Sequence, residues 1–156
     1  MVPILVVRTI VINSKNQILL LRKSPNSKNP GIYEFPGGKV DSIGSIPSDT
    51  AIIEAAVREL QEETRIICNL KDLTEINMKY LHSFQYNSKI FCRDYRFYKL
   101  ILKNDPTVKI GLQIGDDSKP EDNHDGFVWV DFNEYEDMRI SGKTGSNSCV
   151  PVYMII

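Results

Sequence analysis

The stretch "AAVRELQEETRI", residues 55–66, has the spacing of an amphipathic helix that packs against a sheet. Apolar or small side chains recur every three or four residues and predict its core face; they are Ile53, Val57, Leu60 and Thr64. Glu59, Glu62 and Glu63 stand at positions i, i+3 and i+4, so they form a second stripe beside the core face. The helix therefore presents several carboxylates on one side.

The sequence ahead of this helix contains a helix start signal and a glycine turn. Ser48 and Asp49 are the two candidate N-cap residues, and the helix is predicted to run to about Thr64. Further upstream, in "GIYEFPGGKVD", a short strand ends at Phe35 and is followed by a proline and two glycines. Two glycines after a proline let the backbone turn sharply and approach a ligand closely.

The rest of the chain is dominated by β-branched and aromatic segments. Strands are predicted at residues 4–12, 17–22, 76–86, 90–102, 108–114 and 127–130, and a short helix at residues 133–138. The loop "NSKN" between the first two segments has hairpin length. One amphipathic helix among many strands predicts a mixed α/β (α+β) fold, and 156 residues suit a single domain, residues 1–156.

Composition excludes several classes of partner. Nineteen Lys and Arg against 20 Asp and Glu give a net charge of -1, so no basic field draws the chain to a nucleic-acid polymer or a membrane. The aromatic run "FCRDYRFYKL" is accordingly interpreted as sheet core and not as a base-stacking surface. The three cysteines form no C-x-x-C pair, which favours a reducing cytoplasm over a disulfide framework. A small molecule is the expected partner.

The glutamate stripe has two interpretations. A solvated helix face is the ordinary one, with Arg58 placed to pair with Glu54 one turn before it. However, Glu59 and Glu63 are a like-charge i,i+4 pair, which destabilises a helix unless a cation offsets it. Carboxylates with a glycine carbonyl nearby are hard oxygen ligands of the kind that hold Mg²⁺ or Mn²⁺ together with substrate phosphates.

The combination of the two segments resembles the Nudix hydrolase signature, G-x5-E-x7-R-E-U-x-E-E-x-G-U, in which U is a bulky aliphatic residue. The matching positions are Gly38, Arg58, Glu59, Leu60, Glu62, Glu63 and Ile66. The stretch "YEFPGGKVD" is similar to the corresponding W-E-F-P-G-G-K-[VI]-E stretch of the MutT-type branch, with Tyr33 for Trp and Asp41 for Glu. The resemblance extends to about Asp131 and implies an α/β/α sandwich with the signature helix packed on a mixed sheet.

Three positions depart from the family pattern. The chain has about six more residues between Gly38 and Arg58 than the pattern has, so the loop there must bulge. The first glutamate of the pattern is Thr50, for which reduced activity is expected. The glycine after "EET" is Arg65, for which either a stability cost of roughly 1 to 2 kcal/mol or an extended helix end is expected.

The resemblance implies hydrolysis of a nucleoside diphosphate linked to another group, by attack of water at phosphorus with Mg²⁺ or Mn²⁺ as cofactor. Carried over by position, the metal ligands are Glu59, Glu62, Glu63 and the carbonyl of Gly37, and the catalytic residues are Glu62, Glu63 and Arg58. Arg58 would orient a glutamate or the glycine turn. Relatives often carry another glutamate where this chain has Asn123; Glu121, Asp122 and Asp125 are the candidate substitutes.

For the substrate, the MutT-type turn implies a nucleoside triphosphate, such as 8-oxo-dGTP, cut to the monophosphate and pyrophosphate. The predicted substrate-binding residues are Lys23, Lys28, Glu34, Phe35, Gly37 and Gly38. Of the two histidines, His124 is the better candidate for a substrate contact, while His82 fits a packed or edge strand position. Hydrolysis of ADP-ribose, nucleoside diphosphate sugars or dinucleoside polyphosphates is the alternative activity, and a non-catalytic nucleotide-binding module is the alternative class. A monomer and a homodimer are both compatible with the sequence.

Overall fold

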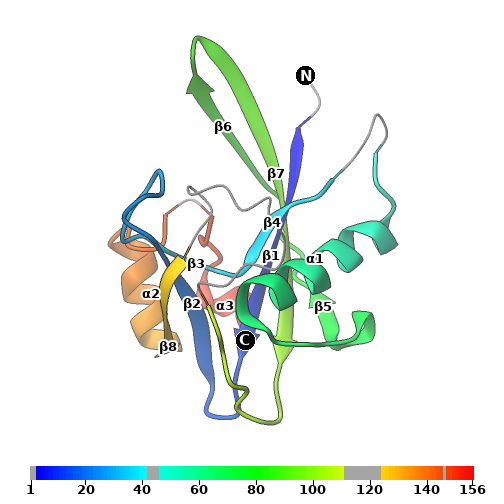
Figure 1. The fold of residues 1–156 in the computed structure, drawn as a ribbon, viewed down its shortest axis with the longest axis vertical. Coiled ribbons are helices and arrows are strands. Elements are labelled where there is room, and N and C mark those ends of the chain that lie inside the picture. The colour runs from blue at the N-terminus through cyan, green and yellow to red at the C-terminus, as the bar shows by residue number, and fades with distance from the viewer. Residues whose placement is uncertain (1–2, 42–45, 111–123, 146) are drawn as a thin grey trace.

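The fold is a mixed sheet with helices on both faces, seen in a computed structural model that describes residues 3–41, 46–110, 124–145 and 147–156 (Figure 1). The strands are β1 (Ile4–Ile12), β2 (Gln17–Lys23), β3 (Tyr33–Glu34), β4 (Gly37–Lys39), β5 (Leu73–Glu75), β6 (Tyr80–Tyr86), β7 (Lys89–Ile101) and β8 (His124–Asp131). The helices are α1 (Asp49–Thr64), the 3-10 turn η1 (Leu70–Asp72), α2 (Phe132–Ile140) and α3 (Val152–Ile155). None of the helices in these described ranges is long and apolar enough to cross a membrane.

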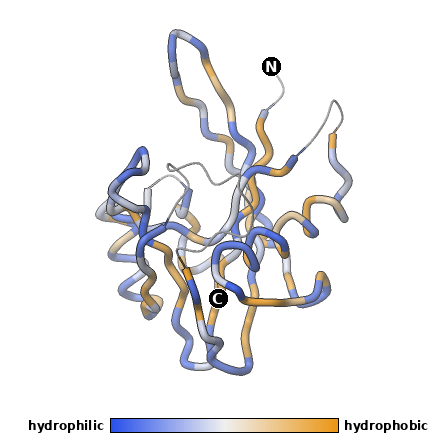
Figure 2. The backbone as a smooth tube through the Cα atoms, in the orientation of Figure 1, coloured by the Kyte–Doolittle hydropathy of each residue, from blue (hydrophilic) through white to orange (hydrophobic). Residues whose placement is uncertain are grey.

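The sheet is built around β1 and β7, which pair in parallel from Ile4 opposite Arg93 to Ile12 opposite Ile101. The main path runs β3-β2-β1-β7-β5, while β4 pairs with β1, β6 with β7 and β8 with β2. The predicted hairpin of β1 and β2 around "NSKN" is confirmed. Figure 2 shows hydrophilic residues in this connection and hydrophobic residues along the strands that it joins.

Alternate side chains of the central strands feed two hydrophobic clusters, one on each face of the sheet. Between the sheet and α1 the cluster includes Val7, Val11, Leu19, Leu21, Ile52, Ala56 and Leu60. On the opposite face, where α2 and α3 lie, the cluster includes Val6, Ile10, Ile18, Leu20, Phe35, Tyr135 and Ile155. The expected α/β/α sandwich with one long helix against the sheet is therefore confirmed (Figure 1).

Helix α1 begins and ends where local signals place its boundaries. The hydroxyl of Ser48 accepts a hydrogen bond from the backbone N–H of Ala51 and caps the helix. At the other end Arg65 takes the left-handed conformation at φ 68°, so the helix stops and does not extend. The buried stripe differs from the prediction: Ile52 and Ala56 are nearly fully buried, whereas Ile53 and Val57 are only partly buried.

Two predicted strands were wrong in extent. Residues 76–86 do not form one strand, because Ile76 turns into the core after β5 and its N–H bonds the carbonyl of Phe97, before β6 begins at Tyr80. Residues 108–110 form no strand; Val108 is buried, and the N–H of Lys109 donates to the carbonyl of Thr64 at the end of α1. The remainder of that predicted strand lies outside the described residues.

Candidate active site

The glycine turn lies directly against the glutamate face of α1. The backbone N–H of Gly37 donates a 2.7 Å hydrogen bond to Oε1 of Glu63. A Cβ atom on Gly38 would lie 2.7 Å from Cδ of Glu59, and one on Gly37 would overlap the backbone carbonyl oxygen of Val7. Strand β4 is held in this position because Gly37 and Gly38 pair with β1. A side chain at either glycine would overlap its neighbours, so the close contact between the turn and α1 requires glycine at both positions. The turn therefore lies beside the carboxylates of both Glu59 and Glu63.

The three helix glutamates differ in environment. The side chain of Glu63 is 9% exposed, and this partial burial raises its pKa to about 8, although the nearby charges of His124 and Arg8 oppose the rise. Burial also raises the pKa of Glu59, against the opposing charge of Arg58. Glu62 is more open, with its side chain 34% exposed, and its Oε1 lies 3.1 Å from Nη1 of Arg58.

Arg58 pairs differently from the expectation. Its guanidinium reaches forward one turn to Glu62 and sideways to Glu59, at 3.1 and 3.4 Å, instead of pairing with Glu54. A carboxylate one turn toward the C-terminus is within reach of the long arginine side chain as well. The implied role of Arg58, orienting glutamates through charge-assisted hydrogen bonds, agrees with this arrangement.

His124 lies between carboxylates from two different elements. Its Nδ1 is 3.2 Å from Oε2 of Glu63 on α1, and its Nε2 is 3.2 Å from Oε2 of Glu34 on β3. A bulge in the pairing of β2 with β8 places the ring there, because Lys23 pairs with His124 while Arg22 pairs with Gly126. Asp125 is the extra residue and forms a 2.7 Å ion pair with Arg22.

Glu34 is held by cations on its other sides. Nη1 of Arg8 lies 3.3 Å from Glu34 Oε2 and also donates to the carbonyl of Phe35 at 3.0 Å. Nζ of Lys23 lies 3.9 Å from Glu34 Oε1. Burial alone would raise the pKa of Glu34, but the charge of Arg8 and the hydrogen bond from His124 outweigh it and lower that pKa to about 2. For His124, burial opposes the charged ring, but Glu34 and Glu63 together raise its pKa.

The donor set suits a divalent cation, although it is not gathered around one point. Within the described part of the chain, no group of three or more His, Cys, Asp or Glu side chains is arranged to hold a metal ion. Yet Glu59 and Glu63 are hard oxygen donors beside the glycine turn, and burial raises the pKa of both carboxyl groups. The residues therefore fit a divalent ion in the chemistry of their donor atoms.

Three other residues named from the sequence, Phe35, Lys28 and Thr50, lie away from the glutamates of α1 or point elsewhere. The ring of Phe35 is fully buried against Tyr135, at 5.5 Å between ring centroids, so its side chain belongs to the core. Lys28 places its Nζ 4.5 Å from the ring centroid of Tyr86 at the tip of β6. Thr50 is exposed in the first turn of α1, roughly 13 Å along the helix axis from Glu59 at about 1.5 Å per residue. Glu121, Asp122 and Asn123 lie outside the described residues.

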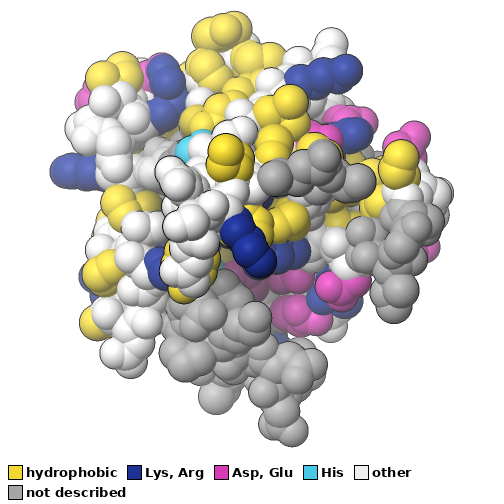
Figure 3. All heavy atoms as spheres, turned by 90° about the horizontal axis from the view of Figure 1, so that it is seen from above, with side chains coloured by type: hydrophobic (Ala, Val, Ile, Leu, Met, Phe, Trp, Pro, Cys, Tyr) yellow, Lys and Arg dark blue, Asp and Glu magenta, His cyan; other side chains and the backbone are white. Residues whose placement is uncertain are grey.

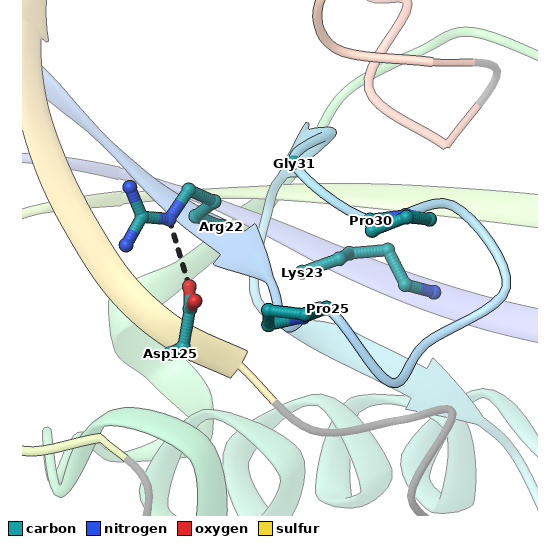
Figure 4. Close-up of a pocket in the computed structure, with 6 residues that line it drawn as sticks. All are labelled: Arg22, Lys23, Pro25, Pro30, Gly31 and Asp125. Carbon is teal, nitrogen blue, oxygen red and sulfur yellow. Dashed lines mark hydrogen bonds and ion pairs between the residues drawn. The ribbon is translucent and has the colours of Figure 1, made fainter.

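A pocket opens beside Lys23 (Figure 4). It has a volume of about 440 Å³ and is lined by Arg22, Lys23, Pro25, Pro30, Gly31 and Asp125. Figure 4 shows the Arg22–Asp125 ion pair on one side and the Lys23 side chain running between the two prolines. Figure 3 shows Asp, Glu, Lys and Arg side chains beside a hydrophobic area, with further Lys and Arg side chains scattered over the same face. Because Lys23 contacts Glu34, the pocket adjoins the buried cluster of charges.

Comparison with known proteins identifies the family of the chain. The NUDIX domain family matches residues 2–150. A MutT protein from Methanosarcina mazei is similar in structure, with 26% identity, a TM-score of 0.62 and coverage of 87% of this chain and 83% of that one. No curated protein matches the sequence.

Two further structures share the fold at lower identity. An Ap4A hydrolase from C. elegans has 19% identity, a TM-score of 0.57 and coverage of 97% and 93% of the two chains. The NUDIX domain of NrtR from Shewanella oneidensis, solved with ADP ribose, has 15% identity, a TM-score of 0.58 and coverage of 86% and 76%. The chain belongs to the Nudix family and is a hydrolase of a pyrophosphate-containing substrate. Members of this family generally use divalent metal ions.

Proposed function

We propose that this Nudix hydrolase cuts a nucleoside triphosphate to the monophosphate and pyrophosphate, with Mg²⁺ or Mn²⁺. The observation that carries the proposal is the contact of Gly37 and Gly38 with Glu63 and Glu59, which forms an oxygen-rich corner at a glycine turn. The proposed metal ligands are Glu59, Glu62, Glu63 and the carbonyl of Gly37. When bound, the ion would neutralise phosphate oxygens and make water a better nucleophile.

The residues of the chain would divide the remaining tasks. Glu62 is the most open of the three glutamates, so its carboxylate is best placed to accept the proton of the attacking water. Glu63 has both oxygens engaged, by Gly37 and His124, and is therefore better suited to a fixed ligand position. Arg58 would keep Glu62 oriented through its hydrogen bond.

The pocket beside Lys23 is the proposed nucleotide site. Arg22 and Lys23 line the pocket, and their positive charges suit a triphosphate. Lys23 also contacts Glu34, so the pocket lies next to the buried charged residues. Gly37 and Gly38 would let the phosphates approach the backbone closely. Glu34 and Phe35 are buried, so we assign them to shaping the pocket from behind and not to contact with the substrate. Lys28 would reach a substrate only by leaving Tyr86.

The likeness to a MutT protein at 26% identity supports the triphosphate over the alternatives, and an oxidised purine nucleotide such as 8-oxo-dGTP is one candidate. We further propose that residues 1–156 act as one domain, as a monomer or homodimer in the cytoplasm. All three cysteines, Cys68, Cys92 and Cys149, are free, which agrees with a reducing compartment.

A panel of nucleotides with Mg²⁺, with the products identified by mass, tests the substrate. Pyrophosphate and monophosphate from a triphosphate support the proposal, whereas AMP and ribose phosphate from ADP-ribose would assign the chain to the alternative substrates. Hydrolysis of no nucleotide, together with tight nucleotide binding, would indicate a non-catalytic module.

Charge removal on α1 tests the site. Glu62→Gln and Glu63→Gln should each lower turnover by roughly 100-fold or more, because each removes a charged oxygen from the reacting region. Glu54→Gln, an exposed glutamate on the same helix, is the matched control and should keep turnover within about twofold. Circular dichroism and urea unfolding would verify that the variants fold. Full activity in both site variants would overturn the assignment of these residues.

A further inference from the structure

His124 occupies a position for which the signature motif has no counterpart. Its side chain is 5% exposed, and each ring nitrogen lies 3.2 Å from a carboxylate oxygen, one on Glu63 and the other on Glu34. The ring therefore joins the glutamate face of α1 to β3 through the interior of the protein. With both nitrogens engaged, His124 has no free nitrogen to offer a substrate.

We propose that His124 is a positioning residue for Glu63, and that the Arg8–Glu34 pair holds His124 in place. This inference rests on the proposed role of Glu63 as a metal ligand. Glu63 then has two anchors from the chain itself, the N–H of Gly37 on Oε1 and the ring of His124 on Oε2.

The support for His124 comes from the far side of the ring. Glu34 Oε2 accepts a hydrogen bond from Nη1 of Arg8, and the same guanidinium nitrogen donates to the carbonyl of Phe35. Arg8 sits in the middle of β1, where Arg8 pairs with Gly37 across the sheet. The chain of contacts from Arg8 through Glu34 and His124 thus returns to Glu63, beside the same glycine turn.

The consequence of this chain of contacts is preorganisation. A glutamate side chain has several rotatable bonds, and fixing them before the ion arrives removes an entropic cost from ion binding. Partners that orient a metal ligand in this way typically change metal affinity or activity 10- to 100-fold when they are removed. Glu62 has no buried anchor of this kind, since Arg58 holds it at the exposed surface of α1.

Metal affinity separates positioning from general structural support. Mn²⁺ binding to the full chain, measured by electron paramagnetic resonance of the free ion, should weaken about tenfold or more in His124→Ala. The apparent metal activation constant should rise in parallel, while KM for the nucleotide at saturating metal changes less than kcat. His82→Ala is the matched control, because His82 is the only other histidine and stacks between Tyr80 and Phe84 on β6.

If His124→Ala does not fold, NMR of the histidine rings in the wild-type protein tests the same inference. With only two histidines, the ring ¹⁵N signals of His124 and His82 can be assigned by the single variant His82→Ala. Mg²⁺ should shift both ring signals of His124 and leave those of His82 unchanged. Glu63→Gln should shift the His124 signals in the metal-free protein and abolish their response to Mg²⁺.

The outcomes distinguish this inference from the proposed function. If the wild type hydrolyses nucleotides and binds Mn²⁺ but His124→Ala folds and binds Mn²⁺ within twofold of it, the positioning role is overturned. The same conclusion follows if Mg²⁺ binds at Glu63 and leaves the His124 signals unmoved. If the wild type neither binds Mn²⁺ nor hydrolyses any nucleotide, the proposed function itself fails, and with it the basis of the positioning role.

Discussion

Gly37 and Gly38 are neighbours in the sequence but meet different atoms. A Cβ on Gly37 would overlap a backbone oxygen of Val7 in the centre of the sheet, which cannot move without shifting β1. A Cβ on Gly38 would instead meet Cδ of Glu59 at 2.7 Å, the far end of a flexible side chain. Glycine at position 37 is therefore needed for the fold, and glycine at position 38 leaves room for the Glu59 carboxylate.

This contrast gives a paired prediction. Gly38→Ala should displace the Glu59 carboxylate and lower turnover by about 10- to 100-fold, with the free energy of unfolding changed by less than about 1 kcal/mol. Gly37→Ala should lower the free energy of unfolding by about 2 kcal/mol or more, because the backbone must give way. Urea unfolding and steady-state kinetics check both variants. Equal stability losses would show that the two positions do not differ as described.

The contacts that the sequence could not predict are those between residues distant along the chain. The glutamates of α1 and the glycine turn lie in recognisable local patterns, so their roles could be hypothesised from spacing. His124 and Glu34 are 90 positions apart, and neither Arg8 nor His124 has a neighbouring pattern that indicates a buried contact. A β-bulge at Asp125 sets the position of His124, and the adjacent Gly126 does not by itself indicate which residue is the extra one.

The ends of α1 depend on individual capping residues. Ser48 is exposed, and its hydroxyl accepts the N–H of Ala51 at 3.2 Å, so its main contribution is the cap itself. Ser48→Ala should reduce the free energy of unfolding by about 1 kcal/mol, because one N–H in the first turn loses its acceptor. Ser48→Asn, which retains a capping oxygen, should stay within a few tenths of a kcal/mol of wild type. Urea denaturation measures both, and an equal loss in the two variants would contradict a capping role.

Element boundaries were predictable where the signal is local and less so where packing decides. The start of α1 follows from a capping residue that acts within one turn, whereas Arg65 gives no sequence signal for the left-handed conformation that ends the helix. The periodicity of Ile53 and Val57 predicts that their side chains face the core. In the structure Ala55 and Ala56 face the sheet, because small side chains let the helix axis come close. Hydrophobic periodicity favours large apolar residues as core positions, so it does not identify the two alanines as the buried ones.

Acid should weaken the entire fold through Glu34. Its pKa is about 2 when folded, below its ordinary value of 4.5, so its contribution to stability is present above pH 4.5 and is lost as the pH falls toward 2. The contribution is on the order of 3 kcal/mol. The difference in free energy of unfolding between wild type and Glu34→Gln should therefore shrink between about pH 5 and about pH 2.5. Urea unfolding across this range measures it, and a constant difference would refute the ion-pair origin.

The sandwich architecture was predictable because alternation on the strands and one long amphipathic helix restrict the possible layers. The order and position of the strands in the sheet were harder to predict from the sequence. The β6–β7 hairpin extends beyond the rest of the sheet in Figure 1, and its position depends on Ile76 leaving the line of β5, where a single Asn77 is the turn-favouring residue.

The parallel pairing of β1 with β7 also bears on how the protein reaches its fold. Ile4 lies opposite Arg93, so the two innermost strands come from opposite parts of the chain and their contact closes a very long loop. We expect slower folding than for a helical protein of this size, since the loop must close before the central contacts form. During synthesis, β1 and β2 leave the ribosome long before β7 exists. One edge of the most hydrophobic strand then stays open to other chains, a period in which a chaperone would have the most effect.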